Sequence, residues 1–457
     1  MAARSSSVGS GVISRATSVQ AKVFAGRRRS EVSVGRSLTA AVAVLALVHT
    51  GAAAASGKPD RSWAAPQIQT VTAAGLMGTK TPATFRPNDL LTAQALANLV
   101  FGLSQVLFPP PILPVEPVPP IQPVVPDPGT TDPTTTDPTT TDPTVTDPTA
   151  TTPTTTDPTT TTDPTQTTPA PVTTTTEPTS PAPPPAPATP PKVANPGARI
   201  TMTALDAQLV SALGLSNAAD EFAQGARAAG LKVPARFGDE VVARLLGLRT
   251  NHPAIEDSLE LLPNDPATRA EAAYSAAAVL HFGGWEVAGV QSLADSFTLP
   301  QLSAWQIRIL DTAVARIGMP YVWGGTSDGS EVDFGVPARG GYDCSGFVWR
   351  VYKLQRYANE GDLASVLRGR TTFVMSGEVP ASQRIGFADL QPADVLFFGA
   401  HGPSSQPSEV DHTAIYLGNG WFIQSSDHGV ALATLTGYYR QEFAWARRPL
   451  REAGLAG

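Results

Sequence analysis

The sequence predicts an α+β fold for the C-terminal part of this chain, with a helix packed on an antiparallel sheet and helical segments upstream. Apolar residues recur at helical spacing after Cys344, two strand-like runs meet at residues 418–420, and a long stretch rich in proline and threonine separates two helix-forming segments. We expect five parts, in this order: residues 1–55, 56–107, 108–197, 198–299 and 300–457.

Residues 1–55 have the pattern of a signal peptide. A basic leader precedes an apolar run at 38–48, and small residues follow at 51–56. The run is shorter than the roughly 20 residues that span a bilayer, so we expect cleavage, a secreted protein and no permanent membrane span. An uncleaved anchor is the alternative.

Segments 56–107 and 198–299 share a pattern that predicts a turn followed by a helix. Pro-Asn-Asp occurs at 87–89 and at 263–265, and in each case a threonine follows after two further residues. Proline and aspartate favour the turn, and the threonine caps the helix that begins after it. We expect helical modules in both segments, and plain helical spacers are the alternative.

The linker at 108–197 is dominated by proline and threonine, and Thr-Asp-Pro-Thr recurs every five residues around Asp132, Asp137, Asp142 and Asp147. Such a composition buries too little apolar surface to offset chain entropy, so we expect disorder. At about 3.1 Å per residue in polyproline II, the linker reaches on the order of 200 Å. The net charge of −7 and the absence of a basic surface outside the leader argue against nucleic-acid binding.

Cys344 is the only cysteine of the chain, so an intramolecular disulfide is impossible. It opens the expected helix, where unpaired N–H groups and the helix dipole favour a thiolate, and we therefore predict a nucleophile with a lowered pKa. An inert buried thiol and an intermolecular disulfide are the alternatives.

His412 lies in a strand-like run and is the expected proton carrier for this thiol. With a three-residue loop at 418–420, Gln424 in the next strand stands on the same face as His412 and can orient its imidazole. A two-residue turn would place Gln424 on the opposite face, and the sequence allows both. A surface or hairpin-stabilising role for Gln424 is a further alternative, in which case Asp427 or His428 supplies the orienting group. The remaining histidines are too scattered to predict a metal site, and we expect no cofactor.

The segment from about 302 to 450 resembles the NlpC/P60 peptidases, papain-like cysteine enzymes of bacterial cell walls. Four blocks carry the resemblance: Gly-Met-Pro-Tyr-Val-Trp-Gly-Gly at 318–325, Asp-Cys-Ser-Gly at 343–346, Leu-Gln-Pro-Ala-Asp-Val-Leu-Phe-Phe at 390–398, and 412–420. Four blocks in the expected order are a specific signal. Ala393 departs from the usual glycine, and the loop 326–342 is longer than usual, so its charged residues can reshape the groove: Asp328, Glu331, Asp333 and Arg339.

The resemblance implies that Cys344 is the nucleophile, His412 the base and Gln424 the orienting residue. It also implies a substrate pocket formed by Asp343, Ser345, Trp323 and Tyr321. The two aromatic residues are equally compatible with a core role. The implied function is an extracellular, cell-wall-associated peptidoglycan hydrolase that cuts stem peptides. A non-catalytic wall-binding or structural protein is one alternative, and an amidase or acyltransferase on the same fold is another.

The upstream Pro-Asn-Asp-x-x-Thr segments resemble the C-terminal half of S-layer homology repeats. The resemblance covers a short part of each segment. It implies helical modules that bind wall polysaccharide.

Overall fold

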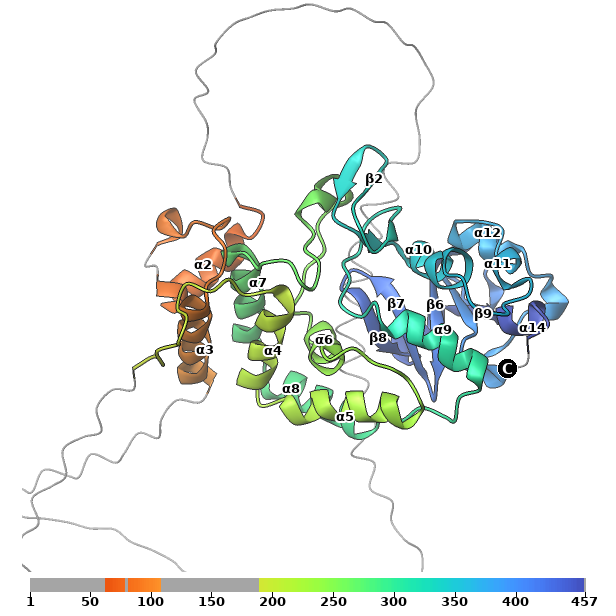
Figure 1. Ribbon diagram of the computed structural model, residues 1–457, viewed down its shortest axis with the longest axis horizontal. Helices are drawn as coiled ribbons and strands as arrows, with labels where there is room; N and C mark the ends of the chain where they lie inside the picture. Colours follow the sequence, from red (N-terminus) through yellow and green to blue (C-terminus); the bar gives the residue numbers. More distant parts are fainter. Residues whose placement is uncertain (1–61, 79–80, 108–188, 456–457) are drawn as a thin grey trace, which may run out of the picture. The chain divides into compact units, whose positions relative to one another are not determined.

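The computed structural model describes residues 62–78, 81–107 and 189–455 (Figure 1). The expected signal peptide and nearly all of the expected linker lie outside the described residues. Segments 62–107 and 189–455 belong to one compact unit, although the linker separates them in sequence.

The helical region, residues 62–107 and 189–299, has helices on both sides of the linker. Before the linker lie α2 (Ala65–Ala73) and α3 (Ala93–Leu107); after it lie α4 (Met202–Ala212), α5 (Ser216–Ala228), α6 (Phe237–Leu245), α7 (Arg269–Leu280) and α8 (Gly284–Asp295). A 3-10 helix, η3 (Ala254–Leu259), precedes α7. Thr268 caps α7 by accepting a hydrogen bond from the N–H of Glu271, as the sequence pattern predicts.

Three short extended segments hold the helical region together across the linker. The N–H of Leu91 donates to the carbonyl of Ala267 (2.8 Å), that of Ala267 to Ile200 (2.7 Å), and that of Ile200 back to Leu91 (3.1 Å). A threonine follows each segment and precedes a helix; the second is Thr201, whose side chain accepts from the N–H of Ala204. The sequence pattern identified only two of these three units, because the Thr201 unit lacks the Pro-Asn-Asp turn. Both ends of the linker are therefore attached to one folded unit.

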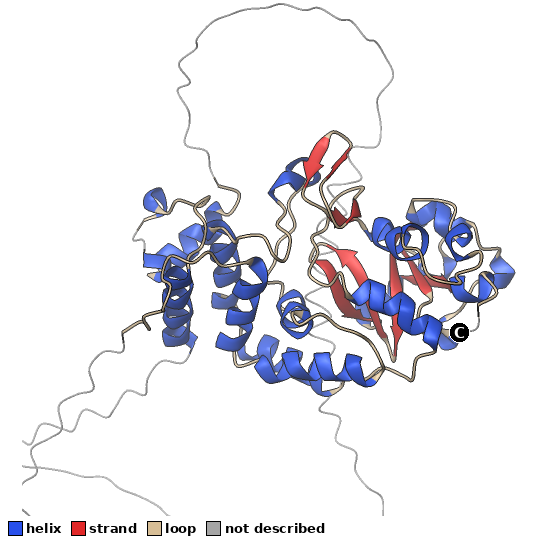
Figure 2. Cartoon of the chain, viewed as in Figure 1, coloured by secondary structure: helices blue, strands red, loops and turns tan. Residues whose placement is uncertain are grey.

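The C-terminal domain has helices packed on an antiparallel sheet, which confirms the predicted fold class (Figure 2). The sheet order is β8-β7-β6-β5-β9, formed by β5 (Val395–Gly399), β6 (Val410–Gly418), β7 (Trp421–Ser426), β8 (Gly429–Thr434) and β9 (Phe443–Arg447). The helices are α9 (Ala304–Val314), α10 (Cys344–Trp349) with the π turn Arg350–Leu354, α11 (Leu363–Val366), α12 (Thr372–Gly377), α13 (Gly437–Glu442) and α14 (Pro449–Glu452). Helix α10 packs on β6 and β7 through an apolar face that includes Phe347 and Val348.

Two small two-stranded sheets occupy the loop before α10. Strands β1 (Thr326–Ser327) and β4 (Gly341–Tyr342) pair with each other, and β2 (Glu331–Asp333) pairs with β3 (Val336–Ala338). The long loop of the sequence is therefore an ordered projection next to the first turn of α10.

The register of β6 and β7 is the one that a three-residue loop at 418–420 produces. Ile415 pairs with Ile423 and Tyr416 with Phe422, and the register shifts at Gly418. The even turn that the sequence also allowed is thereby excluded.

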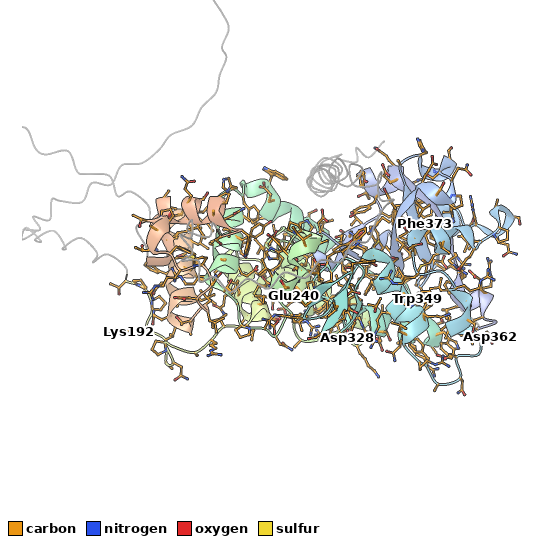
Figure 3. All side chains as sticks on the ribbon, turned by 90° about the horizontal axis from the view of Figure 1, so that it is seen from above. Lys192, Glu240, Asp328, Trp349, Asp362 and Phe373 are labelled. Carbon is orange, nitrogen blue, oxygen red and sulfur yellow. The ribbon has the colours of Figure 1, made fainter. Side chains whose placement is uncertain are left out.

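The helical region is anchored on the C-terminal domain by a buried arginine. Arg244 on α6 donates to the carbonyls of Gly318 and His428 and pairs with Glu240 at 3.3 Å. Glu240 lies fully buried among the packed side chains (Figure 3). Gly318 has φ +87°, and a Cβ there would meet the Glu240 carboxylate at 2.5 Å, so this contact requires glycine.

Candidate active site

Cys344 is the first residue of α10, as the sequence predicts, and it is 9% exposed. The N-cap is Asp343, whose carboxylate accepts from the N–H of Gly346. A Cβ at Gly346 would lie 2.0 Å from the carbonyl oxygen of Gly325, so glycine lets the helix approach the turn at 324–325. The local sequence thus fixes the cysteine at the floor of a pocket.

The predicted lowering of the Cys344 pKa is wrong. Burial, and next the charge of Asp343, raise the pKa of the thiol. The backbone N–H groups of Ser345 and Thr413 oppose the shift, as does the guanidinium of Arg370, but burial outweighs them. The resting group is therefore a neutral thiol at neutral pH, and attack requires a base that removes its proton.

His412 lies on β6 and is 3% exposed. Its Nε2 is 2.6 Å from Oε1 of Gln424 on β7, and the amide nitrogen of Gln424 is 2.7 Å from the hydroxyl of Tyr439. Because the amide nitrogen is turned toward Tyr439, the amide oxygen accepts from the Nε2–H of His412. The tautomer that results leaves Nδ1 of His412 as the nitrogen that can take up a proton.

Tyr439 was not identified in the sequence, because it lies on α13 in a segment without a motif. It is 4% exposed, and its ring packs against Phe398 and Phe422 at centroid distances of 5.6 and 5.0 Å. The hydrogen bonds Tyr439–Gln424–His412 form a buried chain in which neither Gln424 nor Tyr439 needs a charge.

A pocket of about 590 Å³ brings Cys344 and His412 together. The predicted substrate residues also line it: Tyr321, Trp323, Asp343 and Ser345. Trp323 is 48% exposed, so its indole is available at the pocket wall. Gln424 lies behind His412 and does not line the pocket.

Arg370, which follows α11, is a pocket residue that the sequence motifs did not reveal. Its Nη1 lies 3.0 Å from Oδ1 of Asp343 and 2.6 Å from the Ser345 hydroxyl, and its Nη2 donates to the carbonyl of Gly324 at 2.9 Å. Asp343 and Ser345 are thus already held by Arg370, and the three side chains form one polar wall beside Cys344.

The charged residues of the long loop have different positions. Asp333 lines the pocket together with Val332 and Phe334. Asp328 instead pairs with Arg316 at 2.8 Å and with Arg350 at 3.1 Å. The other two also point elsewhere: Glu331 accepts from the N–H of Thr326 at 2.8 Å, and Arg339 pairs with Asp265 at 3.7 Å.

The described residues contain no group of three or more His, Cys, Asp or Glu side chains arranged to hold a metal ion. Within residues 62–78, 81–107 and 189–455, no helix has both the length and the apolar character that a bilayer crossing needs.

Two family sequence models match this chain. The NlpC/P60 family matches residues 318–448, and the S-layer homology domain matches residues 59–92. The chain is similar to murein DD-endopeptidase MepH of Escherichia coli, with 31% identity over 160 residues, which cover 34% of this chain and 50% of the relative. It is also similar to the probable peptidoglycan endopeptidase LytE of Bacillus subtilis, with 30% identity over 142 residues, 31% of this chain and 34% of the relative. The chain thus spans half or less of the length of these relatives.

Solved structures also align with the C-terminal domain. The NlpC/P60 domain of peptidoglycan hydrolase SagA aligns with 26% identity and a TM-score of 0.22, covering 31% of this chain and 97% of that one. An NlpC/P60 family protein from Bacillus cereus aligns with 25% identity and a TM-score of 0.24, covering 34% and 42%.

Proposed function

We propose that this chain, whose residues 318–448 form an NlpC/P60 domain, is an exported peptidoglycan hydrolase that cleaves stem peptides through Cys344. The observation that carries the proposal is that the single thiol of the chain shares a pocket with a buried histidine whose Nε2 is held by Gln424. The peptidoglycan endopeptidases among its relatives support the substrate class.

The proposed reaction is acyl transfer. His412 removes the proton from Sγ of Cys344 as the sulfur attacks the peptide carbonyl, and a C–S bond forms. The carbonyl oxygen gains negative charge, which the backbone N–H of Cys344 stabilises. The imidazolium of His412 then protonates the leaving amine as the C–N bond breaks. Water, deprotonated by His412, releases the acyl group and restores the thiol.

Gln424 is proposed to hold the imidazole in the reactive tautomer. Its amide accepts from Nε2–H but carries no charge, so it stabilises the imidazolium less than a carboxylate does. The neutral thiol of the resting pocket fits this arrangement, because no persistent imidazolium has to be balanced.

The helical region is proposed to bind wall polysaccharide and thereby hold the enzyme at the cell surface. This proposal rests on the S-layer homology match at 59–92 and on the three threonine-capped units joined at Leu91, Ile200 and Ala267. A polypeptide of residues 56–300 that is soluble and helical should sediment with purified cell walls. A folded polypeptide that stays in the supernatant would contradict wall binding.

The deciding experiment incubates the purified protein with soluble muropeptides and identifies the products by mass spectrometry. We expect new products cut within the stem peptide, and no products with Cys344→Ala. A cut between the sugar lactyl group and the peptide would indicate an amidase, and a folded parent protein that binds muropeptides without cutting them would indicate a binding protein.

A further inference from the structure

Asp257 connects the helical region to the wall of the active-site pocket. It lies on η3, outside residues 318–448, and it is 2% exposed. Its Oδ2 accepts a hydrogen bond from the backbone N–H of Trp323 at 3.0 Å. A carboxylate distant in sequence is therefore bonded to a residue that lines the pocket with Cys344.

The turn that carries Trp323 is held by two carboxylates from different elements. Asp257 accepts from the N–H of Trp323, and Asp343 accepts from the next N–H, that of Gly324, at 3.0 Å. These two consecutive hydrogen bonds come from different elements and together fix the orientation of the peptide units. The direction of the indole at the pocket wall thus depends on Asp257 as well as on Asp343.

The same 3-10 helix supports a second wall of the pocket. Helix η3 packs against β3 of the β2–β3 hairpin (Figure 1). The hairpin presents Val332 and Phe334 to the pocket, and these side chains are 68% and 83% exposed. On its other side, Val332 and Ser258 line a separate hollow of about 350 Å³. Two exposed walls of the pocket therefore rest on one short segment of the helical region.

We propose that Asp257 is a positioning residue for substrate binding: by holding the Trp323 turn it keeps the pocket wall in the shape that grips the substrate. The inference rests on the proposed function. Asp257 binds the backbone of Trp323 and is not among the residues lining the pocket with Cys344 and His412, so its removal weakens binding without slowing the chemical step.

The test uses the full-length protein and soluble muropeptides released from peptidoglycan by a muramidase. Asp257→Ala should raise KM about three- to tenfold, as expected for the loss of one hydrogen bond, and should leave kcat within about twofold. Asp257→Asn keeps an acceptor oxygen and should stay near the parent KM. Glu256→Ala removes the neighbouring carboxylate of η3 and serves as the control, with kinetics like the parent. The rate of iodoacetamide labelling of Cys344 should be the same in all four proteins.

A double-mutant cycle with Trp323→Ala separates positioning from a general loss of stability. Trp323→Ala should itself raise KM, and adding Asp257→Ala to it should raise KM no further. An unchanged KM for folded Asp257→Ala, an unchanged KM for Trp323→Ala, or full additivity of the two would each overturn the proposal. If Asp257→Ala does not fold, an unchanged KM for Trp323→Ala or a clearly raised KM for folded Asp257→Asn still overturns the proposal.

Calorimetric binding of the same muropeptides to Cys344→Ala, with and without Asp257→Ala, provides the test without turnover. A parent protein that binds muropeptides but cuts none would refute the proposed function, whereas equal affinities of the two variants would refute the role of Asp257 alone.

Discussion

The helical region and the active site bury polar groups in different ways. In the helical region, carboxylates lie in the interior among two arginines and a histidine, and burial raises the pKa of Asp206 to about 7 and that of Glu260 to about 8. In the active site, the buried chain Tyr439–Gln424–His412 joins side chains that need no charge. The interior of the helical region thus contains ionisable acids, whereas hydrogen bonds between uncharged groups orient the active-site histidine.

This difference predicts opposite responses to pH. Rising pH ionises the Cys344 thiol, whose pKa burial raises, and so favours the attacking form. Rising pH also ionises Asp206 and Glu260 in their buried sites. Because their pKa values are raised on folding, the stability they contribute is present below the pKa of the unfolded chain and is lost as pH rises through about 7 and 8.

The largest expected effect comes from removing His412, the proton carrier at the pocket end of the hydrogen-bonded series Tyr439–Gln424–His412. His412→Ala should lower kcat/KM for muropeptides by about a thousandfold or more, because the neutral thiol then lacks a base. His401→Ala is the control, since His401 is exposed and pairs with Glu409 at 3.4 Å, and it should leave the rate unchanged. A His412→Ala enzyme within tenfold of the parent would contradict the mechanism.

A smaller effect is expected at Tyr439, the other end of the hydrogen-bonded series Tyr439–Gln424–His412. Tyr439→Phe removes the hydroxyl that fixes the amide of Gln424 and keeps the packed ring, so kcat should fall about three- to thirtyfold with little change in KM. Tyr438→Phe, the adjacent tyrosine, is the matched control. Equal kinetics for Tyr439→Phe and the parent would show that Gln424 needs no support.

The raised pKa of Cys344 predicts slow alkylation of the folded protein. Iodoacetamide labelling should be slower at pH 7 than for the urea-unfolded chain, and it should rise only above the pKa of about 8.5 of an ordinary cysteine. Asp343→Asn retains a helix cap and removes a charge that raises this pKa, so its labelling should increase at lower pH. Fast labelling of the parent at pH 7 would instead indicate a preformed thiolate.

The smallest effect concerns the buried acids of the helical region, Asp206 and Glu260. The melting temperature of the parent should fall between pH 5 and pH 8.5 as Glu260 and Asp206 lose protons. Glu260→Gln cannot ionise and should reduce that fall by a few degrees. Asp220→Asn, an exposed change on α5, should leave the slope as in the parent. A parent curve that is flat over this range would remove the contrast between the two regions.

The sequence predicted what contiguous motifs can carry. The helix beginning at Cys344, the strands at His412 and Gln424, and the caps at Thr92 and Thr268 are each encoded within a few neighbouring residues. The sequence did not predict the roles of Asp257, Arg370 and Tyr439. Each reaches the site from another element through side-chain hydrogen bonds, and such bonds leave no pattern among neighbouring residues.

The error in the direction of the Cys344 pKa has a similar origin. A motif shows that a helix begins at the cysteine, but desolvation depends on everything that packs around it. The third threonine unit was missed for a different reason: Thr201 caps α4 without the Pro-Asn-Asp turn that precedes the other two threonines.

The backbone hydrogen bonds that join Leu91, Ile200 and Ala267 also determine what proteolysis would do to this protein. A single cut anywhere between residues 108 and 188 would leave two polypeptides. Helix α3, whose buried side chains are Leu96, Leu99 and Leu103, would still pack on α4 and α7, and α2 would still pack on α7. The nicked protein should migrate as two bands in a denaturing gel and elute as one species on a sizing column. Cleavage in this linker would therefore leave the C-terminal domain still bound to the segment at 62–107.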